Sequence, residues 1–233
     1  GRFTIRWDIY PSQPASGYAA YHVDTAMAYY SPGGKKKKES WDEYYTRKTR
    51  GLMEFICDAI RAADQEQGAT GSPFRDVRLD SEGNPVDASG NPVGFMIIHA
   101  GASYLTDGGK SGAFGLDSPS DMIDAFISAD FFRYFRDEIQ CDTLGDRLGV
   151  RVRADSGDFV IDELMMIPET SNQDGLNWGI NGILVNQIAR QLGIPDLFST
   201  SSGISGIGAF CIMDFAGYSA AQGFIPPWPS AWV

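Results

Sequence analysis

The sequence predicts an α+β domain with a mixed sheet and a few long helices. Two segments, 41–63 and 176–192, carry apolar residues at helical spacing. Four other segments have the apolar patterns of strands: 3–9, 94–101, 159–161 and 163–168. We expect these elements to form one domain over 1–233, which we interpret as a piece of a longer chain.

Both predicted helices have one apolar face. In the first helix this face consists of Leu52, Phe55, Ile56, Ala59 and Ile60. In the second it consists of Ile180, Ile183, Leu184, Ile188 and Leu192. Gly193 is expected to cap the second helix, with Pro195 beyond it. The segment 121–140 mixes aromatic and charged residues, and we expect it to form strands or loops packed on the core.

Composition and charge exclude several classes of protein. Hydrophobic residues make up 43% of the chain and aromatic residues 12%, which excludes a wholly disordered protein. The net charge of −11 repels phosphate backbones, so we expect no nucleic-acid binding. No apolar stretch reaches about 18 residues, so we expect no transmembrane segment. The run Lys35–Lys38 is interpreted as a solvated loop, because nothing aromatic or rich in arginine surrounds it closely.

The three cysteines, Cys57, Cys141 and Cys211, form no CxxC pair, which argues against a zinc ribbon or a thioredoxin-like site. Three buried free thiols are the simplest interpretation, and one disulfide plus a free thiol is the alternative. The sequence also lacks a nucleophile elbow, a Walker P-loop and a dinucleotide-binding glycine loop. The adjacent acids Asp162 and Glu163 are only a weak hydrolase signal, because such pairs are common on solvated loops.

The most informative segment is VNQIARQLGIPDLF, from Val185 to Phe198. Three other segments are considered with it: IIHAG at 97–101, GAFCIMD at 208–214 and IPPWPSAW at 225–232. In their order along the chain, the four segments resemble those of the immune inhibitor A family of secreted metalloproteases, whose members carry H-E-x-x-H before an L-G-[LI]-P-D-L segment. The resemblance implies a zincin-like metalloprotease fold, with an active-site-type helix at about 176–192 and a Met-turn at Met213.

Within this resemblance, the residues that carry catalysis are replaced. Asn186 stands at the first His, Gln187 at the Glu and Arg190 at the second His. Zincins need two imidazoles one helical turn apart for the metal and a carboxylate between them to activate water. Amides are poor zinc ligands and poor general bases, and an arginine places a fixed positive charge where the dication would lie. Only Asp196 remains of the implied ligands, so we expect no zinc, and we hypothesise that it pairs with Arg190.

We therefore expect a catalytically inactive metalloprotease-like domain that acts as a structural or protein-binding module, with a protein partner or a larger assembly. The family resemblance implies a secreted, cell-surface or periplasmic location. Two alternatives stay open: an active zinc metallopeptidase with an altered metal site, and a calcium-dependent adhesion module. An ordinary amphipathic helix with a chance likeness to the family is the simplest competing interpretation.

A calcium site is the second candidate. Oxygen-bearing side chains alternate around a glycine, as in calcium-binding loops: Asp80, Glu82, Asn84 and Asp87. The run is similar to a shortened form of the family's D-x-D-G-D-G-x-x-D segment. The repeated Gly-Asn-Pro-Val at 83–86 and 90–93 equally predicts two plain turns. His99, at the end of a predicted strand, is interpreted as a buried structural histidine.

Overall fold

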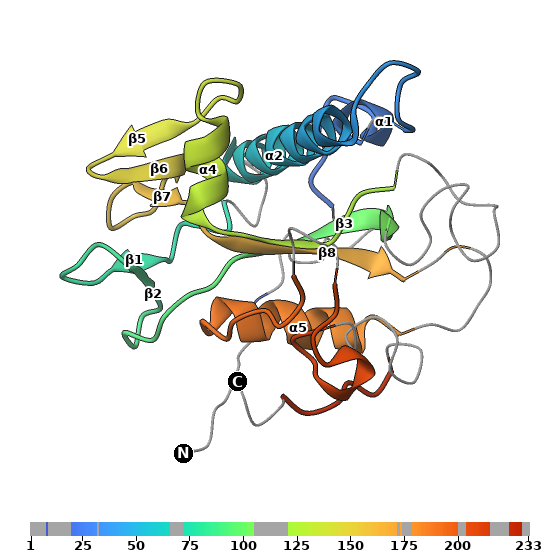
Figure 1. The fold of residues 1–233 in the computed structure, drawn as a ribbon. Helices are drawn as coiled ribbons and strands as arrows, with labels where there is room; N and C mark the ends of the chain where they lie inside the picture. Colours follow the sequence, from blue (N-terminus) through green and yellow to red (C-terminus); the bar gives the residue numbers. More distant parts are fainter. Residues whose placement is uncertain are drawn as a thin grey trace.

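A computed structural model of the chain describes residues 8, 20–31, 33–65, 72–104, 121–171, 173, 179–199, 204–214 and 224–229. The described residues form a mixed α+β structure with three small sheets, which confirms the α+β part of the predicted fold class (Figure 1). The strand predicted at 3–9 lies, apart from Asp8, outside the described residues.

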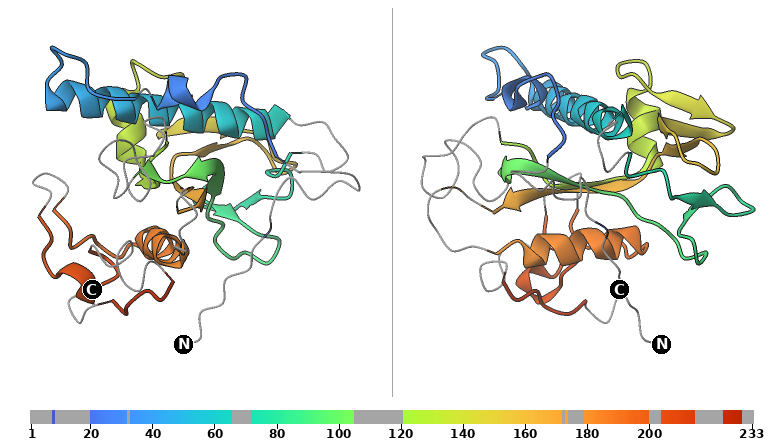
Figure 2. Two further views of the ribbon diagram at one scale, coloured as in Figure 1. Left: turned by 90° about the vertical axis from the view of Figure 1, so that its right-hand side faces the viewer. Right: turned by 180° about the vertical axis from the view of Figure 1, so that it is seen from behind.

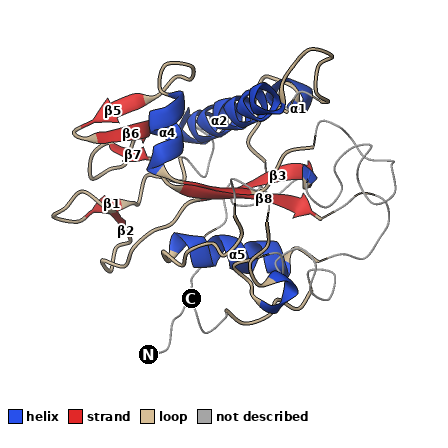
Figure 3. Cartoon of the chain, viewed as in Figure 1, coloured by secondary structure: helices blue, strands red, loops and turns tan. Residues whose placement is uncertain are grey.

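The elements are distributed along the whole described chain (Figure 3). The helices are α1 (Met27–Tyr30), α2 (Trp41–Gln65), α4 (Ala129–Phe135), α5 (Asn181–Gln191) and the 3-10 helix η2 (Gly208–Phe210). The strands are β1 (Arg78–Leu79), β2 (Pro85–Val86), β3 (Met96–Ala102), β4 (Ala125–Ile127), β5 (Asp142–Leu144), β6 (Arg147–Val152), β7 (Phe159–Ile161) and β8 (Leu164–Thr170). The predicted first helix corresponds to α2, and the three later predicted strands correspond to β3, β7 and β8.

The central sheet is mixed, as predicted. Its order is β3-β8-β4, with β3 parallel and β4 antiparallel to β8. Figures 1 and 2 show α2 over one face of this sheet and α5 across the other. Leu164–Ile167 are therefore buried at every position rather than alternately, which is the pattern of a strand covered on both faces. This layering places α5 directly against β8.

The hydrophobic core lies mainly between α2 and the sheets. Met53 and Ile56 of α2 are completely buried, in one cluster with Val150 of β6 and Met166 of β8. The antiparallel sheet β5-β6-β7 packs against α2 and α4. At about 1.5–3 kcal/mol for each fully buried large apolar side chain, this cluster is the main source of stability in the described structure.

One local prediction, that of strands or loops over 121–140, is confirmed at β4 but wrong for the residues that follow it. Within 121–140, where strands or loops were expected, residues 129–135 form helix α4. Phe132 and Phe135 lie one helical turn apart and are 0% and 2% exposed, whereas Tyr134 points outward and is 71% exposed. Aromatic residues have only moderate helix propensity, so this helix owes its stability to the burial of one face rather than to local preference.

Close backbone packing fixes one glycine on α2. A Cβ atom added at Gly51 would overlap the carbonyl oxygen of Tyr30, at the end of α1. The two helices can therefore approach at this point only because residue 51 has no side chain.

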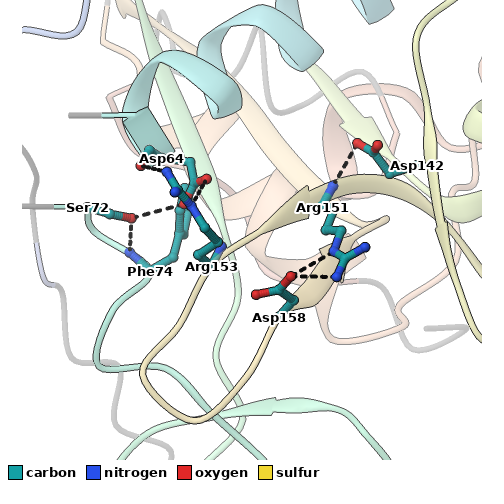
Figure 4. Close-up of polar contacts among 7 residues, drawn as sticks. All are labelled: Asp64, Ser72, Phe74, Asp142, Arg151, Arg153 and Asp158. Atoms are coloured by element: carbon teal, nitrogen blue, oxygen red, sulfur yellow. Dashed lines mark hydrogen bonds and ion pairs between the residues drawn. The ribbon is translucent and has the colours of Figure 1, made fainter. Parts of the chain in front are cut away.

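Charged pairs join β6 and the residue after it to α2 and to the loop before β7 (Figure 4). The Nε of Arg153 lies 3.2 Å from Oδ2 of Asp64 at the end of α2, and the Arg153 backbone N–H donates to Oδ1 of the same carboxylate at 3.1 Å. The Nη2 of Arg151 lies 2.6 Å from the carboxylate of Asp158. Among the described helices, none has the length and apolar composition needed to cross a membrane, in agreement with the prediction from sequence.

Candidate functional site

The candidate site is built on α5. This helix begins at Asn181, inside the predicted range of 176–192, and residues 174–178 lie outside the described chain. Its end matches the prediction. Gly193 has φ +79° and donates to the carbonyl of Arg190 at 2.9 Å, while the N–H of Ile194 donates to that of Ala189 at 3.0 Å. These two bonds form a Schellman motif, which a glycine at this position favours.

The buried face of α5 differs from the predicted apolar face. Ile183 is buried as expected, but Leu192 is 53% exposed. Asn186 and Gln187 are buried instead, at 1% and 0% exposure. The reason is that α5 is covered by the central sheet and also by the segment 211–213, which packs on Ala189. Two of the three positions implied for metal binding and catalysis therefore lie in the interior.

These two amides are incompletely hydrogen-bonded. The Nδ2 of Asn186 donates to the carbonyl of Ile212 at 2.8 Å. Within the described chain, Oδ1 of Asn186 and both amide atoms of Gln187 have no hydrogen-bond partner. A buried polar atom without a partner costs about 1–3 kcal/mol, so this interface is less favourable than an apolar helix–sheet contact.

The third position forms the hypothesised ion pair. The Nη2 of Arg190 lies 2.8 Å from Oδ1 of Asp196, and the two side chains are 25% and 27% exposed. Burial raises the pKa of the Asp196 carboxyl, while the Arg190 guanidinium acts in the opposite direction. The prediction that Arg190 and Asp196 pair is confirmed.

Met213 lies under the helix. It is completely buried and belongs to a small apolar cluster with Ala189 of α5, Cys211 and Ile212. Its carbonyl accepts a hydrogen bond from the N–H of Leu197 at 2.8 Å. The segment that follows α5 is thus tied to the segment that contains Met213, although the two are separated along the chain.

Asp214 is a residue of this site that the sequence analysis did not single out. It is 4% exposed, and its Oδ2 accepts hydrogen bonds from Ser205 Oγ at 3.0 Å and from the Gly208 N–H at 2.8 Å. This carboxylate holds the start of η2 against the turn at 211–214. An acid at the end of an otherwise apolar run was the available signal for its burial.

A cavity of about 280 Å³ lies beside the C-terminal end of α5. Its walls include Phe95, Arg147, Asp162, Glu163 and Gln191. The Nε2 of Gln191 donates to Glu163 at 2.6 Å, and the Arg147 guanidinium pairs with Asp162. Burial, and then the nearby Asp162 charge, raise the pKa of Glu163. The sequence suggested that these adjacent acids lie on a solvated loop, but they line a cavity instead. There Asp162 is paired with Arg147, and Glu163 is hydrogen-bonded to Gln191.

The proposed calcium residues are divided between two turns, with Asp80, Glu82 and Asn84 in the first and Asp87 in the second. Oδ1 of Asp80 accepts the N–H groups of Glu82 and Asn84 at 2.8 Å, and its Oδ2 accepts from the Asn84 amide. Seven residues later, Asp87 makes the same bonds to Ser89 and Asn91. Backbone hydrogen bonding lowers the pKa of Asp80. This geometry is that of the two plain turns.

Other candidate ligands are dispersed. His99 is 3% exposed with Nδ1 2.9 Å from the Ala100 carbonyl, and burial lowers its pKa, so the prediction of a buried histidine is confirmed. The cysteines are free thiols: Cys57 and Cys211 are buried and Cys141 is half-buried. Within the described ranges, no group of three or more His, Cys, Asp or Glu side chains is placed to hold a metal ion.

No protein-family model, no curated protein and no solved structure matches the chain.

Proposed function

We propose that this chain is a catalytically inactive metalloprotease-like domain of the immune inhibitor A type, and that it works as a structural or protein-binding module. The observation that carries the proposal is the Arg190–Asp196 ion pair. The guanidinium lies 2.8 Å from the single carboxylate of the implied ligand set. A fixed positive charge at that distance competes directly with a dication for the same oxygen.

The surroundings of α5 support the zincin-like part of the proposal. The helix ends in a glycine cap, the following segment returns beneath it, and Met213 is buried against Ala189. A Met-turn passing under an active-site-type helix requires this arrangement. The amide of Gln187, which is buried and which the resemblance aligns with the family's catalytic Glu, carries no group that can accept a proton from water near neutral pH.

Peptide binding by strand addition is the proposed mode of interaction. Among the described strands, β3 pairs only with β8, so one of its edges has no strand partner in that part of the chain. Ile98 of β3 is 55% exposed. An extended segment of a partner protein can hydrogen-bond to such an edge while its side chains contact the exposed apolar positions. The proposed setting is a secreted or envelope-associated assembly.

Zinc content and peptidase activity test the proposal together. The purified protein is analysed for metal by mass spectrometry and incubated with an unstructured protein substrate, with and without a chelator. We expect no stoichiometric zinc and no chelator-sensitive cleavage. Stoichiometric zinc with cleavage that the chelator abolishes would instead establish an active metallopeptidase with an altered site, and Asp196→Asn would then reduce both zinc content and activity.

A further inference from the structure

The N-terminal end of α2 and the loop before it form an exposed tip, which consists of Lys35–Lys38, Trp41 and Tyr45. Trp41 and Tyr45 are 61% and 58% exposed, and their rings stack with centroids 5.9 Å apart at an interplanar angle of 26°. Figures 1 and 2 show this end of α2 at an outer corner of the molecule, away from the sheets. Large aromatic side chains with this exposure have substantial apolar area that remains in contact with water.

The lysines of the tip form no salt bridge within the described residues. All four are exposed, and the salt bridges of the described residues are made by arginines. Three acids belong to the same segment: Glu39 is paired with Arg47 at 2.7 Å, and Asp42 and Glu43 lie in the first turn of α2, where Glu43 accepts a hydrogen bond from the Ser40 N–H. With Glu39 balanced by Arg47, the four lysines exceed the two remaining acids, so on a chain of net charge −11 the tip is a local excess of positive charge.

Aromatic and basic groups are in contact at the tip. The Nζ of Lys35 lies 5.6 Å from the centroid of the Trp41 ring, within the range of a cation–π interaction. This corrects the expectation from sequence, in which the lysine run was a solvated loop with nothing aromatic close to it. The helix turn that follows the loop brings Trp41 back beside Lys35.

We propose that this tip docks onto the surface of an anionic lipid bilayer. Tryptophan and tyrosine favour the headgroup region, where the ring is partly buried and its polar atom stays hydrated. Clustered lysines are attracted to acidic headgroups as mobile point charges. A protruding corner suits a flat partner, and the 25-residue helix behind it is anchored in the core through Met53 and Ile56.

Charge favours a bilayer over a nucleic acid. Nucleic-acid recognition relies heavily on arginine forks and on contacts spread along a phosphate backbone, and an acidic chain repels that backbone beyond the tip. At a bilayer only the tip needs to approach the surface, and charges farther away than about 10 Å are largely screened at 0.1 M salt. This inference does not depend on the proposed metalloprotease-like function.

Vesicle flotation tests the inference. The protein is mixed with phosphatidylcholine vesicles that contain or lack phosphatidylglycerol, at low and high salt. We expect partitioning only onto the anionic vesicles, weakened by salt. Replacing all four lysines by glutamine (K35Q, K36Q, K37Q and K38Q) should lower the partition coefficient by about two orders of magnitude or more, at roughly fivefold for each lysine. Trp41→Ala should lower it by roughly tenfold.

Controls separate docking from folding. Tyr134→Ala removes an aromatic side chain of similar exposure on α4 and should leave partitioning unchanged. Circular-dichroism melts should show that the lysine and Trp41 variants remain folded. Absence of partitioning onto anionic vesicles, equal partitioning of the four-lysine variant, or binding to a soluble polyanion such as heparin without binding to vesicles would each overturn the proposal.

Discussion

Removing the Arg190–Asp196 pair is the perturbation whose result can be predicted in most detail. The informative set is Arg190→Met, Asp196→Asn and the variant that carries both. Arg190→Met keeps much of the apolar stem but leaves the Asp196 carboxylate without its counter-ion. Asp196→Asn leaves the guanidinium with a neutral partner. The double variant removes both charges, so a double-mutant cycle isolates the coupling between them.

The magnitude follows from the partial burial of the pair. Its side chains are 25% and 27% exposed, between the fully exposed and the fully buried extremes. Exposed pairs contribute about 0.2–1 kcal/mol, and breaking a fully buried pair costs about 3–5 kcal/mol. We therefore expect a coupling of about 1–2 kcal/mol near pH 7, with Arg190→Met the more damaging single change, because it leaves a partly desolvated anion.

The pH dependence has a definite sign. Burial raises the pKa of Asp196, and loss of Arg190 removes the opposing influence and raises this pKa further. The carboxyl of the variant is neutral at low pH, where the missing counter-ion matters little. The destabilisation caused by Arg190→Met should therefore grow as the pH rises from about 4 to about 7.

Urea unfolding of the wild type, the two single variants and the double variant, at about pH 4 and about pH 7, measures the coupling energy and its pH dependence. The coupling energy at pH 7 should exceed the usual limit of additivity, about 0.5 kcal/mol, and should shrink at pH 4. If the effects of the two substitutions were additive at pH 7, or if the coupling did not change with pH, Arg190 and Asp196 would not be stabilising the folded protein as an ion pair.

Three further predictions concern other parts of the fold. Burial lowers the pKa of Lys48 to about 8, so the free energy of unfolding should rise by about 1 kcal/mol between about pH 8 and pH 10 relative to Lys48→Met, allowing for solvent screening of this partly exposed group, as measured by urea unfolding of both proteins. Gly51→Ala should destabilise the protein by about 3 kcal/mol or more, because the new methyl group overlaps the carbonyl of Tyr30; Gly94→Ala, where the space is ordinary, should cost less than about 1 kcal/mol in the same assay. Asp80→Ala should lower the Tm by a few degrees, because the turn loses the hydrogen bonds to its aspartate. Calcium should raise the Tm of neither the wild type nor this variant. A calcium-dependent rise in the Tm of the wild type alone would favour a calcium loop.

Helical periodicity predicted α2 well, because one face of a long helix repeats the same environment over many turns. It did not predict α4, since the burial of Phe132 and Phe135 depends on contacts with distant strands. On α5 the cap at Gly193 depends on local sequence and was predicted. The buried face of the helix depends on distant contacts and was not predicted. Leu192 is exposed and Asn186 is buried because the segment at 211–213 packs against the helix, and no local pattern contains that contact.

The candidate site was predictable in part for the same reason. Positions 186, 187 and 190 lie on one helix, and the segment that follows brings Asp196 to Arg190. Sequence spacing and opposite charge were therefore sufficient to predict this ion pair. The hydrogen bond from Asn186 to Ile212 and the burial of Asp214 arise from tertiary contacts. At 80–93, spacing alone did not distinguish a calcium loop from two turns, because both use an aspartate that faces backbone N–H groups.

Zinc titration of a variant that restores the implied ligands tests the central proposal most directly. The variant carries Asn186→His, Gln187→Glu and Arg190→His, which places two imidazoles one helical turn apart and releases Asp196 from its ion pair. Cobalt substitution, followed by absorption spectroscopy, reports tetrahedral binding in the variant and in the wild type. The proposed loss of a zincin site predicts stoichiometric binding by the variant and none by the wild type. Stoichiometric zinc in the wild type, or no binding by a folded variant, would contradict it.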